Sequence, residues 1–157
     1  MKTNKAICII PARGGSKRIP RKNILPLNGK PLMAYSIDAA VNSKVFEKVV
    51  VSTEDAEIKE IALKCGADVD DRPEHMAGDS VTKVQVVKEY IERKQIESDY
   101  DYVAALLPTC PFRSFEDIQL AFQKIISQDK CDFLIGVTEY EFPVGLALEK
   151  ESELLKM

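Results

Sequence analysis

The chain has 157 residues, of which 45% are hydrophobic and 30% charged, with 7 Gly and 8 Pro. This length suits one domain with a sizeable core, and the composition excludes disordered, collagen-like and low-complexity chains. The net charge of −3 is unevenly distributed, because positions 1–37 hold eight basic and no acidic residues. The remaining 120 residues hold 14 basic and 25 acidic ones. A basic segment on an acidic domain favours a small phosphorylated ligand over nucleic acid.

Short apolar runs and helical stripes alternate along the first half of the chain. Residues 6–11 and 48–52 are apolar runs that predict buried strands. Ser52 or Thr53 is expected to cap the helix that follows, since acidic residues occupy its first turn. Gly66 predicts the end of that helix.

The pattern continues through the middle of the chain. Residues 67–69 predict a short strand, which leads into a polar loop. A helix over residues 81–94 is expected to bury Val84, Val87 and Ile91, which recur at helical spacing.

A further strand and helix are predicted before the chain becomes harder to interpret. Residues 101–107 predict a strongly apolar strand, and Ser114 with Asp117 forms a near capping box at the start of a helix. Residues 132–137 predict another strand. The tail, residues 145–157, fits either a hairpin or a short helix.

Apolar strands that alternate with helices imply right-handed crossovers and parallel pairing. The sequence therefore predicts an α/β fold, a three-layer α/β/α sandwich around a mostly parallel sheet, in one domain over residues 1–157. The longest apolar run is too short to cross a bilayer and no signal peptide is evident, so we expect a cytoplasmic protein without membrane contact. The 4 cysteines stand apart beside 1 histidine. They are expected to be buried reduced thiols rather than disulfides or zinc ligands.

Three predicted loops leave the carboxyl ends of parallel strands, where ligands bind in such sheets: residues 11–27, 70–80 and 108–113. The first loop holds two glycines and several cations without an acid. Glycines allow close backbone approach to an anion, and the cations add charge-assisted hydrogen bonds, so this loop suits a triphosphate. The alternative is a solvated basic loop that binds nothing. Neither a P-loop nor a GxGxxG fingerprint is present.

The run IPARGGSKRIPRKNILPLNGKPLMAYSIDAA, residues 10–40, resembles the N-terminal signature of the acylneuraminate cytidylyltransferase family. The resemblance continues through VVVSTEDAEI, RPEHMAGDS and LLPTCPFRSFEDI. It implies a Rossmann-like nucleotidyltransferase that joins CTP to a nonulosonic, sialic-acid-like sugar acid and gives a CMP-sugar and pyrophosphate, with Mg²⁺ required.

The resemblance also implies roles for individual residues. Arg13 and Lys22 match the cations that hold the triphosphate and are the candidate catalytic residues. The expected nucleotide-binding residues are Arg13, Gly14, Gly15, Ser16, Lys17, Lys22, Asn23, Arg72, Asp79 and Ser80. Asn23 is expected near the ribose and Arg72 beside the cytosine, although a surface salt-bridge role is the alternative for Arg72.

The loop LLPTCPFR departs from the family pattern LQPTSPLR at three positions, of which two exchange a polar residue of the pattern. Leu107 replaces a glutamine that faces the sugar, and Cys110 replaces a serine. The expected sugar-side residues are Leu107, Thr109 and Arg113, yet Leu107 equally fits the last core residue of its strand. Arg113 fits either a sugar-carboxylate contact or the start of a helix. His75 is expected to be exposed or structural.

The family's metal-holding aspartates lie beyond the matched stretch, so no metal ligand is assigned and the chain is expected to be a C-terminally incomplete piece of a homodimeric protein. Without that region we expect weak CTP binding, no transferase activity and self-association. The main alternative is a nucleotide-binding fragment without catalysis. Another sugar nucleotidyltransferase is a weaker alternative, because the glycine loop differs from that of the sugar-phosphate enzymes.

Overall fold

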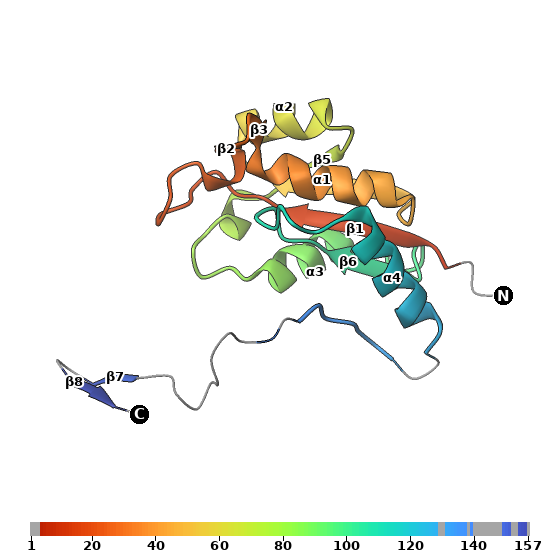
Figure 1. The fold of residues 1–157 in the computed structure, drawn as a ribbon. Coiled ribbons are helices and arrows are strands. Elements are labelled where there is room, and N and C mark those ends of the chain that lie inside the picture. Colours follow the sequence, from red (N-terminus) through yellow and green to blue (C-terminus); the bar gives the residue numbers. More distant parts are fainter. Residues whose placement is uncertain (1–3, 129–130, 138, 140–148, 152–153, 157) are drawn as a thin grey trace.

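The computed structural model describes residues 4–128, 131–137, 139, 149–151 and 154–156. A four-stranded parallel sheet has the order β5-β4-β1-β6 and is flanked by helices (Figure 1). Its strands are β1 (Ala6–Pro11), β4 (Lys48–Thr53), β5 (Asp68–Asp71) and β6 (Tyr102–Ala105). The helices are α1 (Leu32–Ser43), α2 (Ala56–Lys64), α3 (Lys83–Lys94) and α4 (Phe115–Ile126). This arrangement confirms the predicted α/β fold.

Shorter elements complete the described chain. The described 3-10 helices are η1 (Lys22–Ile24) and η2 (Glu74–Met76). One hairpin consists of β2 (Pro26–Leu27) and β3 (Lys30–Pro31), and another of β7 (Glu149–Glu151) and β8 (Leu154–Lys156). The antiparallel pairing of β7 with β8 decides between the two alternatives for the tail in favour of a hairpin.

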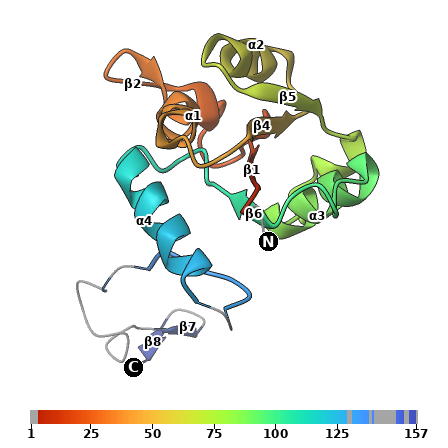
Figure 2. The ribbon, with the colours of Figure 1, turned by 90° about the vertical axis from the view of Figure 1, so that its right-hand side faces the viewer.

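Helices lie on both faces of the sheet (Figure 2). On one face α1, α2 and α4 pack against β1 and β4, and the largest core cluster includes Ile10, Met33, Ile37, Val51 and Ile58. On the other face α3 covers a smaller cluster formed around Ile7, Ile9, Val50 and Tyr90. The two faces of β1 therefore contribute to different cores, which gives the three layers.

Strand β1 is buried along its whole length because it has a parallel neighbour on both sides. Ile9 lies opposite Val50 of β4 and Ala105 of β6, so the carboxyl ends of these strands reach the same edge of the sheet. The segments that follow β1, β4, β5 and β6 consequently meet at this edge, which is where the sequence predicts that a ligand binds.

Three local predictions are wrong. Strand β4 continues through Thr53, so Asp55 rather than Ser52 or Thr53 caps α2, and its side chain accepts a hydrogen bond from the Ile58 amide. Helix α3 begins two residues later than expected, and the prediction for its buried face is wrong at Val84, which is exposed. Val87 and Ile91 pack against the smaller cluster as predicted, beside Val86 and Tyr90, which are buried.

The third wrong prediction is the strand over residues 132–137, because this segment forms no strand and pairs with none of the described strands. Phe133, Ile135 and Val137 are exposed, because a strand requires a hydrogen-bonded neighbour that this segment lacks in the described structure.

The capping box at the start of α4 is confirmed, and Ser114 and Asp117 exchange both hydrogen bonds. All four cysteines are free thiols, but Cys8 is buried and Cys131 is exposed, so the prediction of uniformly buried thiols is wrong. Within the described residues, no helix combines the length and apolar character needed to cross a bilayer.

Candidate active site

A pocket of about 240 Å³ lies at the carboxyl edge of the parallel sheet. It is bounded by the loop after β1, the loop between β5 and α3, the start of α3 and the loop after β6. Its lining residues are Pro11, Arg13, Ser16, Lys22, Asn23, Arg72, Met76, Gly78, Asp79, Val81, Lys83, Val86, Pro108 and Thr109.

The pocket brings together seven of the residues predicted from the sequence, which come from three separate loops. These residues are Arg13, Ser16, Lys22, Asn23, Arg72, Asp79 and Thr109. Six other predicted residues are not part of the lining, namely Gly14, Gly15, Lys17, Ser80, Leu107 and Arg113.

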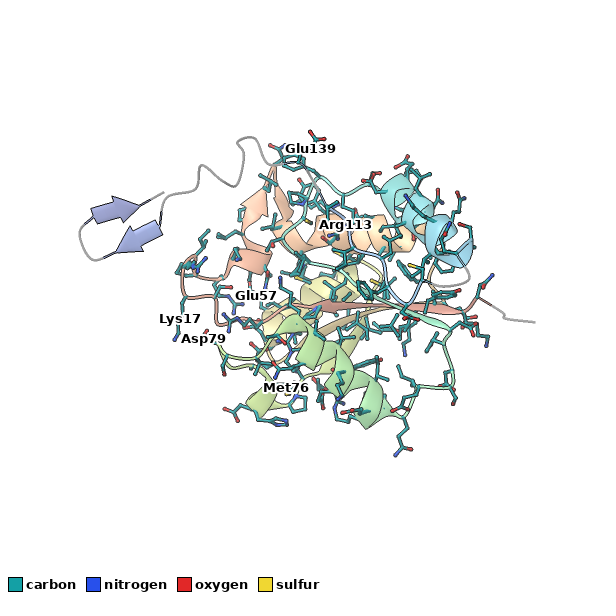
Figure 3. The ribbon with its side chains drawn as sticks, turned by 90° about the horizontal axis from the view of Figure 1, so that it is seen from below. Lys17, Glu57, Met76, Asp79, Arg113 and Glu139 are labelled. Atoms are coloured by element: carbon teal, nitrogen blue, oxygen red, sulfur yellow. The ribbon has the colours of Figure 1, made fainter. Side chains whose placement is uncertain are left out.

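A carboxylate joins two of the predicted triphosphate-binding cations. Asp79 Oδ1 lies 2.8 Å from Arg13 Nη1, and Asp79 also forms an ion pair with Lys17. Figure 3 shows Lys17 and Asp79 side by side at this end of the molecule. The hydrogen bond from Lys17 is the main cause that lowers the pKa of Asp79. The loop between β5 and α3 is thereby tied to the loop after β1 by charge.

Asn23 and Lys22 are positioned by the single turn of η1. Asn23 is buried, and its Nδ2 donates a 2.9 Å hydrogen bond to the backbone oxygen of Arg13. This bond fixes the course of the loop, which is a role that the sequence did not indicate. Lys22 lines the pocket, and its ammonium forms no ion pair with any residue that the structure describes.

Arg72 is buried at the base of the pocket. It donates hydrogen bonds to the oxygen atoms of Ser52, and its Nη1 lies 3.7 Å from Glu54 Oε2. Desolvation lowers the pKa of Arg72, while the nearby charges of Glu54 and Asp70 oppose that shift. The surface salt-bridge alternative does not describe this side chain, which is only 3% exposed.

An ion pair between the buried Asp70 and Arg93 shares Ser52 with Arg72. Asp70, on β5, accepts a hydrogen bond from Ser52 Oγ at 3.0 Å and two from Arg93 Nη2 at 2.9 Å. Since Arg93 belongs to α3, this pair connects the edge of the sheet to the helix that forms one wall of the pocket.

Gly14 is required by close packing rather than by an unusual backbone angle. A Cβ atom at this position would lie 2.4 Å from Asp55 Oδ2 and 3.0 Å from Asp55 Cβ. The Gly14 amide donates a 2.7 Å hydrogen bond to Glu54 Oε1, so in this structure it faces a carboxylate rather than the pocket. Gly15 has open space around it.

Arg21 belongs to the basic loop but supports its structure. Its guanidinium donates to both oxygens of Asp55 and to Glu57 Oε2 at 2.5 Å. The hydrogen bond with Asp55 is the main cause that raises the pKa of Arg21, and the same bond is the main cause that lowers the pKa of Asp55. The loop after β1 is therefore clamped to the N-terminus of α2.

The predicted sugar-side residues do not share one environment. Thr109 lines the pocket, whereas Leu107 is half-buried and its backbone oxygen accepts a 2.8 Å hydrogen bond from Ser36 of α1. Arg113 lies apart from Lys17 and Asp79 in Figure 3, and its charge partly offsets the burial that raises the pKa of Cys8. Its Nη1 is buried without a hydrogen-bond partner among the described residues.

Two residues of this region were missed by the sequence reasoning. Glu54 directly follows β4, and the rule that strand ends share an edge could have placed it beside the loop after β1. Lys83 lines the pocket as the first residue of α3. The feature of the sequence that could have identified Lys83 is a cation in the first turn of a helix, where acidic residues are favoured.

The described residues do not fit a magnesium site. No group of three His, Cys, Asp or Glu side chains among them could hold a metal ion. Asp79 is the one acidic side chain among the pocket residues, and it is already engaged by Arg13 and Lys17. His75 is exposed on η2 and is not part of the pocket lining.

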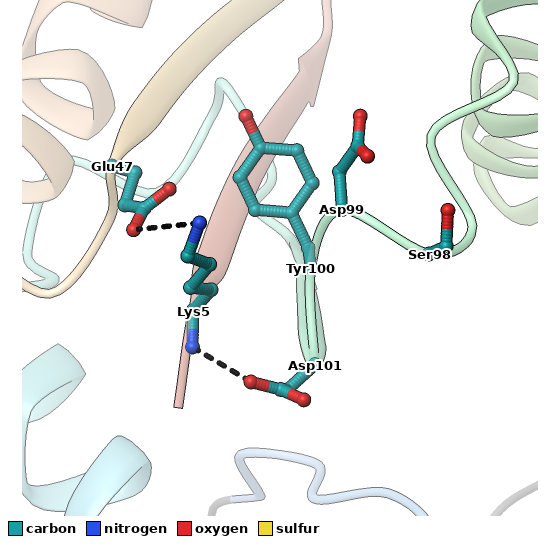
Figure 4. Close-up of a pocket in the computed structure, with 6 residues that line it drawn as sticks. All are labelled: Lys5, Glu47, Ser98, Asp99, Tyr100 and Asp101. Carbon is teal, nitrogen blue, oxygen red and sulfur yellow. Dashed lines mark hydrogen bonds and ion pairs between the residues drawn. The ribbon is translucent and has the colours of Figure 1, made fainter. Parts of the chain in front are cut away.

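A second hollow, of about 470 Å³, lies at the opposite edge of the sheet, beside the amino ends of β1, β4 and β6 (Figure 4). Lys5 spans it, with its amide 3.0 Å from Asp101 Oδ2 and its ammonium 4.0 Å from Glu47 Oε1. With Asp99 among its lining residues, this hollow is mainly acidic and does not suit a phosphate group.

Comparisons with known proteins find relatives over most of this chain. The cytidylyltransferase family model matches residues 7–147. A pseudaminic acid cytidylyltransferase from Campylobacter jejuni is 45% identical over 145 residues, which cover 91% of this chain and 62% of that protein. An N-acylneuraminate cytidylyltransferase from Escherichia coli is 40% identical over 139 residues, covering 88% of this chain and 32% of that protein.

Structural similarity leads to the same fold. The solved structure of CMP:2-keto-3-deoxy-manno-octonic acid synthetase complexed with CTP superposes with a TM-score of 0.68 at 22% identity, covering 80% of this chain and 49% of that chain. The chain thus spans less than two thirds of the length of these relatives. Since the family model covers most of its residues, the chain belongs to the cytidylyltransferase family.

Proposed function

We propose that this chain binds CTP in the pocket at the carboxyl edge of the sheet, and that its protein transfers the CMP group to a nonulosonic acid. The observation that carries the proposal is the convergence of Arg13, Lys22 and Arg72 on one pocket from two separate loops. Three guanidinium or ammonium groups suit the several negative charges of a triphosphate. The names of the relatives, which act on pseudaminic and N-acylneuraminic acids, support a sugar acid as the acceptor.

In the proposed reaction the 2-hydroxyl oxygen of the sugar acid attacks the α-phosphorus of CTP. The bond between the α-phosphorus and the oxygen that bridges to the β-phosphate breaks, pyrophosphate leaves, and the proton of the attacking hydroxyl passes to water. Such transfers depend chiefly on positioning and charge stabilisation. Arg13 and Lys22 are proposed to stabilise the charge that develops on the phosphate oxygens.

The remaining predicted residues keep the roles that the resemblance implies. Around the nucleotide we place Gly14, Gly15, Ser16, Lys17, Asn23, Arg72, Asp79 and Ser80, and around the sugar acid Leu107, Thr109 and Arg113. Magnesium stays an expectation from the resemblance, because the described residues do not fit a site for it. A homodimeric protein in the cytoplasm is also proposed, and exposed Phe112 and Leu120 support an association surface.

Calorimetric titration with CTP tests the binding half of the proposal. Arg13→Ala and Lys22→Ala should each weaken CTP binding by about 1.5–3 kcal/mol if they make charge-assisted phosphate contacts. Lys64→Ala is the matched control, because Lys64 is exposed on α2 outside the pocket and its Nζ lies 3.8 Å from Glu60 Oε2. Unchanged CTP affinity in both pocket variants would remove this pocket from the proposal.

Pyrophosphate release with CTP, Mg²⁺ and a panel of nonulosonic acids tests the transfer half. We expect turnover by the protein to depend on both CTP and a sugar acid. Tight CTP binding without pyrophosphate release for any sugar acid would contradict the transfer and favour the alternative of a nucleotide-binding protein without catalysis.

A further inference from the structure

Four basic side chains line the pocket, and they differ in what neutralises them. Arg13 is paired with Asp79, and Arg72 lies 3.7 Å from Glu54. Lys22 and Lys83 also line the pocket, and neither side chain forms an ion pair or hydrogen bond with a described residue. Two positive charges without a counter-ion therefore face the same space.

Lys83 comes from a different part of the chain than the basic loop does. It is the first residue of α3 and follows the cap residue Thr82, whose hydroxyl accepts a 3.2 Å hydrogen bond from the Gln85 amide. The Gln85 side chain in turn accepts a 2.7 Å hydrogen bond from the Thr82 amide. The amides of Thr82 and Gln85 are thus satisfied by side chains of this helix terminus, and the Lys83 side chain takes no part in the cap.

The position is unfavourable for a lysine within the domain itself. The positive end of the helix dipole lies at this terminus, so a cation here is destabilising, and α3 has no acidic residue in its first turn to compensate. Residues that break a local rule without a compensating contact are expected at functional sites. A ligand anion in the pocket would provide the missing contact.

We infer that Lys83 is a further specificity-determining residue of this pocket and binds a phosphate group of the nucleotide, opposite the cations of the loop after β1. The inference rests on the proposed function and deepens it, because it adds a contact from α3 to a site otherwise built from loops.

Nucleotide titrations on the 157-residue chain test this inference. Lys83→Gln should weaken CTP binding by about tenfold, as expected when one charge-assisted hydrogen bond is lost, and should leave the weaker binding of cytidine unchanged. Lys83→Arg should keep most of the CTP affinity, since it retains the charge. Lys88→Gln is the matched control, because Lys88 lies on the same helix, is exposed and pairs with Glu92 at 3.6 Å.

The outcomes separate this inference from the proposed function. Equal CTP affinity in Lys83→Gln and the unsubstituted chain, while Arg13→Ala still weakens binding, overturns the role of Lys83 alone. An equal loss for CTP and cytidine overturns the phosphate contact, because cytidine carries no phosphate. A chain that binds no CTP before substitution overturns both. Thermal unfolding of each variant shows whether the fold is kept, as expected for an exposed side chain.

Discussion

The amide of Gly14 donates a hydrogen bond to Glu54 Oε1 at 2.7 Å, although the two residues lie 40 positions apart in the sequence. This bond joins the loop after β1 to the residue that directly follows β4. The other oxygen of Glu54 lies 3.7 Å from Arg72 Nη1. One carboxylate thus positions both the basic loop and the buried arginine at the base of the pocket, without itself lining the pocket.

Gly14→Ala should disturb this arrangement, whereas Gly15→Ala should not. The added Cβ at position 14 would lie 2.4 Å from Asp55 Oδ2, and Asp55 is held by Arg21 and by its role as a helix cap. We expect Gly14→Ala to lower the free energy of unfolding by about 1–3 kcal/mol, the usual cost of overpacking, and to weaken CTP binding.

Gly15→Ala is a close control, since it has open space and no positive φ. Urea unfolding and CTP titration of both variants provide the comparison. Similar behaviour of the two variants would show that the contact with Asp55 does not determine the course of the loop.

Asp79→Asn should strengthen CTP binding. The Asp79 carboxylate neutralises Arg13 and Lys17, and its negative charge repels a triphosphate that approaches the same cations. Calorimetry at low salt, where such effects are least screened, measures the change in affinity. Asp71→Asn removes the same charge from a carboxylate that pairs with Lys59 away from the pocket, and it should have little effect. Weaker binding in Asp79→Asn would instead indicate a direct contact between Asp79 and the nucleotide.

Stability at acidic pH should depend on the pair between Arg21 and Asp55. The hydrogen bond from Arg21 is the main cause that lowers the pKa of Asp55 below its ordinary value of 3.8. A carboxyl with a lowered pKa in the folded state contributes stability above its unfolded value, and that contribution is lost as pH falls through the folded value. Asp55→Asn keeps a good helix cap but removes the charge.

Urea unfolding of both proteins between neutral pH and about pH 3 tests this linkage. The stability difference between the unsubstituted chain and Asp55→Asn should be constant near neutral pH and should shrink below pH 3.8. A difference that does not change with pH would exclude the ion pair as its source.

In a full-length version of the protein, Leu107→Gln should shift the ratio of kcat/KM among nonulosonic acids and leave CTP affinity unchanged. Leu107 follows β6 and its backbone is fixed by Ser36, so the substitution changes the side chain without moving the loop. An added amide can pair with a sugar hydroxyl, and such pairing discriminates between substrates. Pyrophosphate release with several sugar acids measures the ratio. Equal effects on every sugar acid would identify Leu107 as a core residue.

Periodicity and composition were sufficient to predict the main sheet. Strand β1 is apolar along its length and β4 contains three consecutive valines, so both could be recognised without knowledge of their neighbours. Helix α3 shows the limit of this reasoning, because Val84 and Val87 are equally apolar, yet only Val87 packs against the cluster that contains Ile7 and Ile9, while Val84 is exposed. Residues 132–137 illustrate the same limit, since a strand depends on a neighbour that the pattern does not contain.

The candidate site was predictable where one loop carried the chemistry, as with Arg13 and Lys22. It was not predictable where a side chain acts on a distant segment. Glu54, which follows β4, accepts a hydrogen bond from Gly14, which follows the adjacent strand β1, and Asp79 pairs with Arg13 from a different loop. Such pairs form only after the strands align, so no local spacing in the sequence could reveal them.

The unequal size of the two apolar clusters affects how the pocket opens. Helix α3 covers the smaller cluster, and the pair between Arg93 and Asp70 joins it to β5. Because β1 is buried along its whole length and α3 is not, local unfolding of α3 should require less free energy than that of β1. Because Lys83 and Val86 form one wall of the pocket, brief unwinding of this helix would admit or release a ligand from that side. A bound nucleotide would then slow amide hydrogen exchange in α3 more than in the strands, and ligand residence time would depend on how firmly one helix adheres to the sheet.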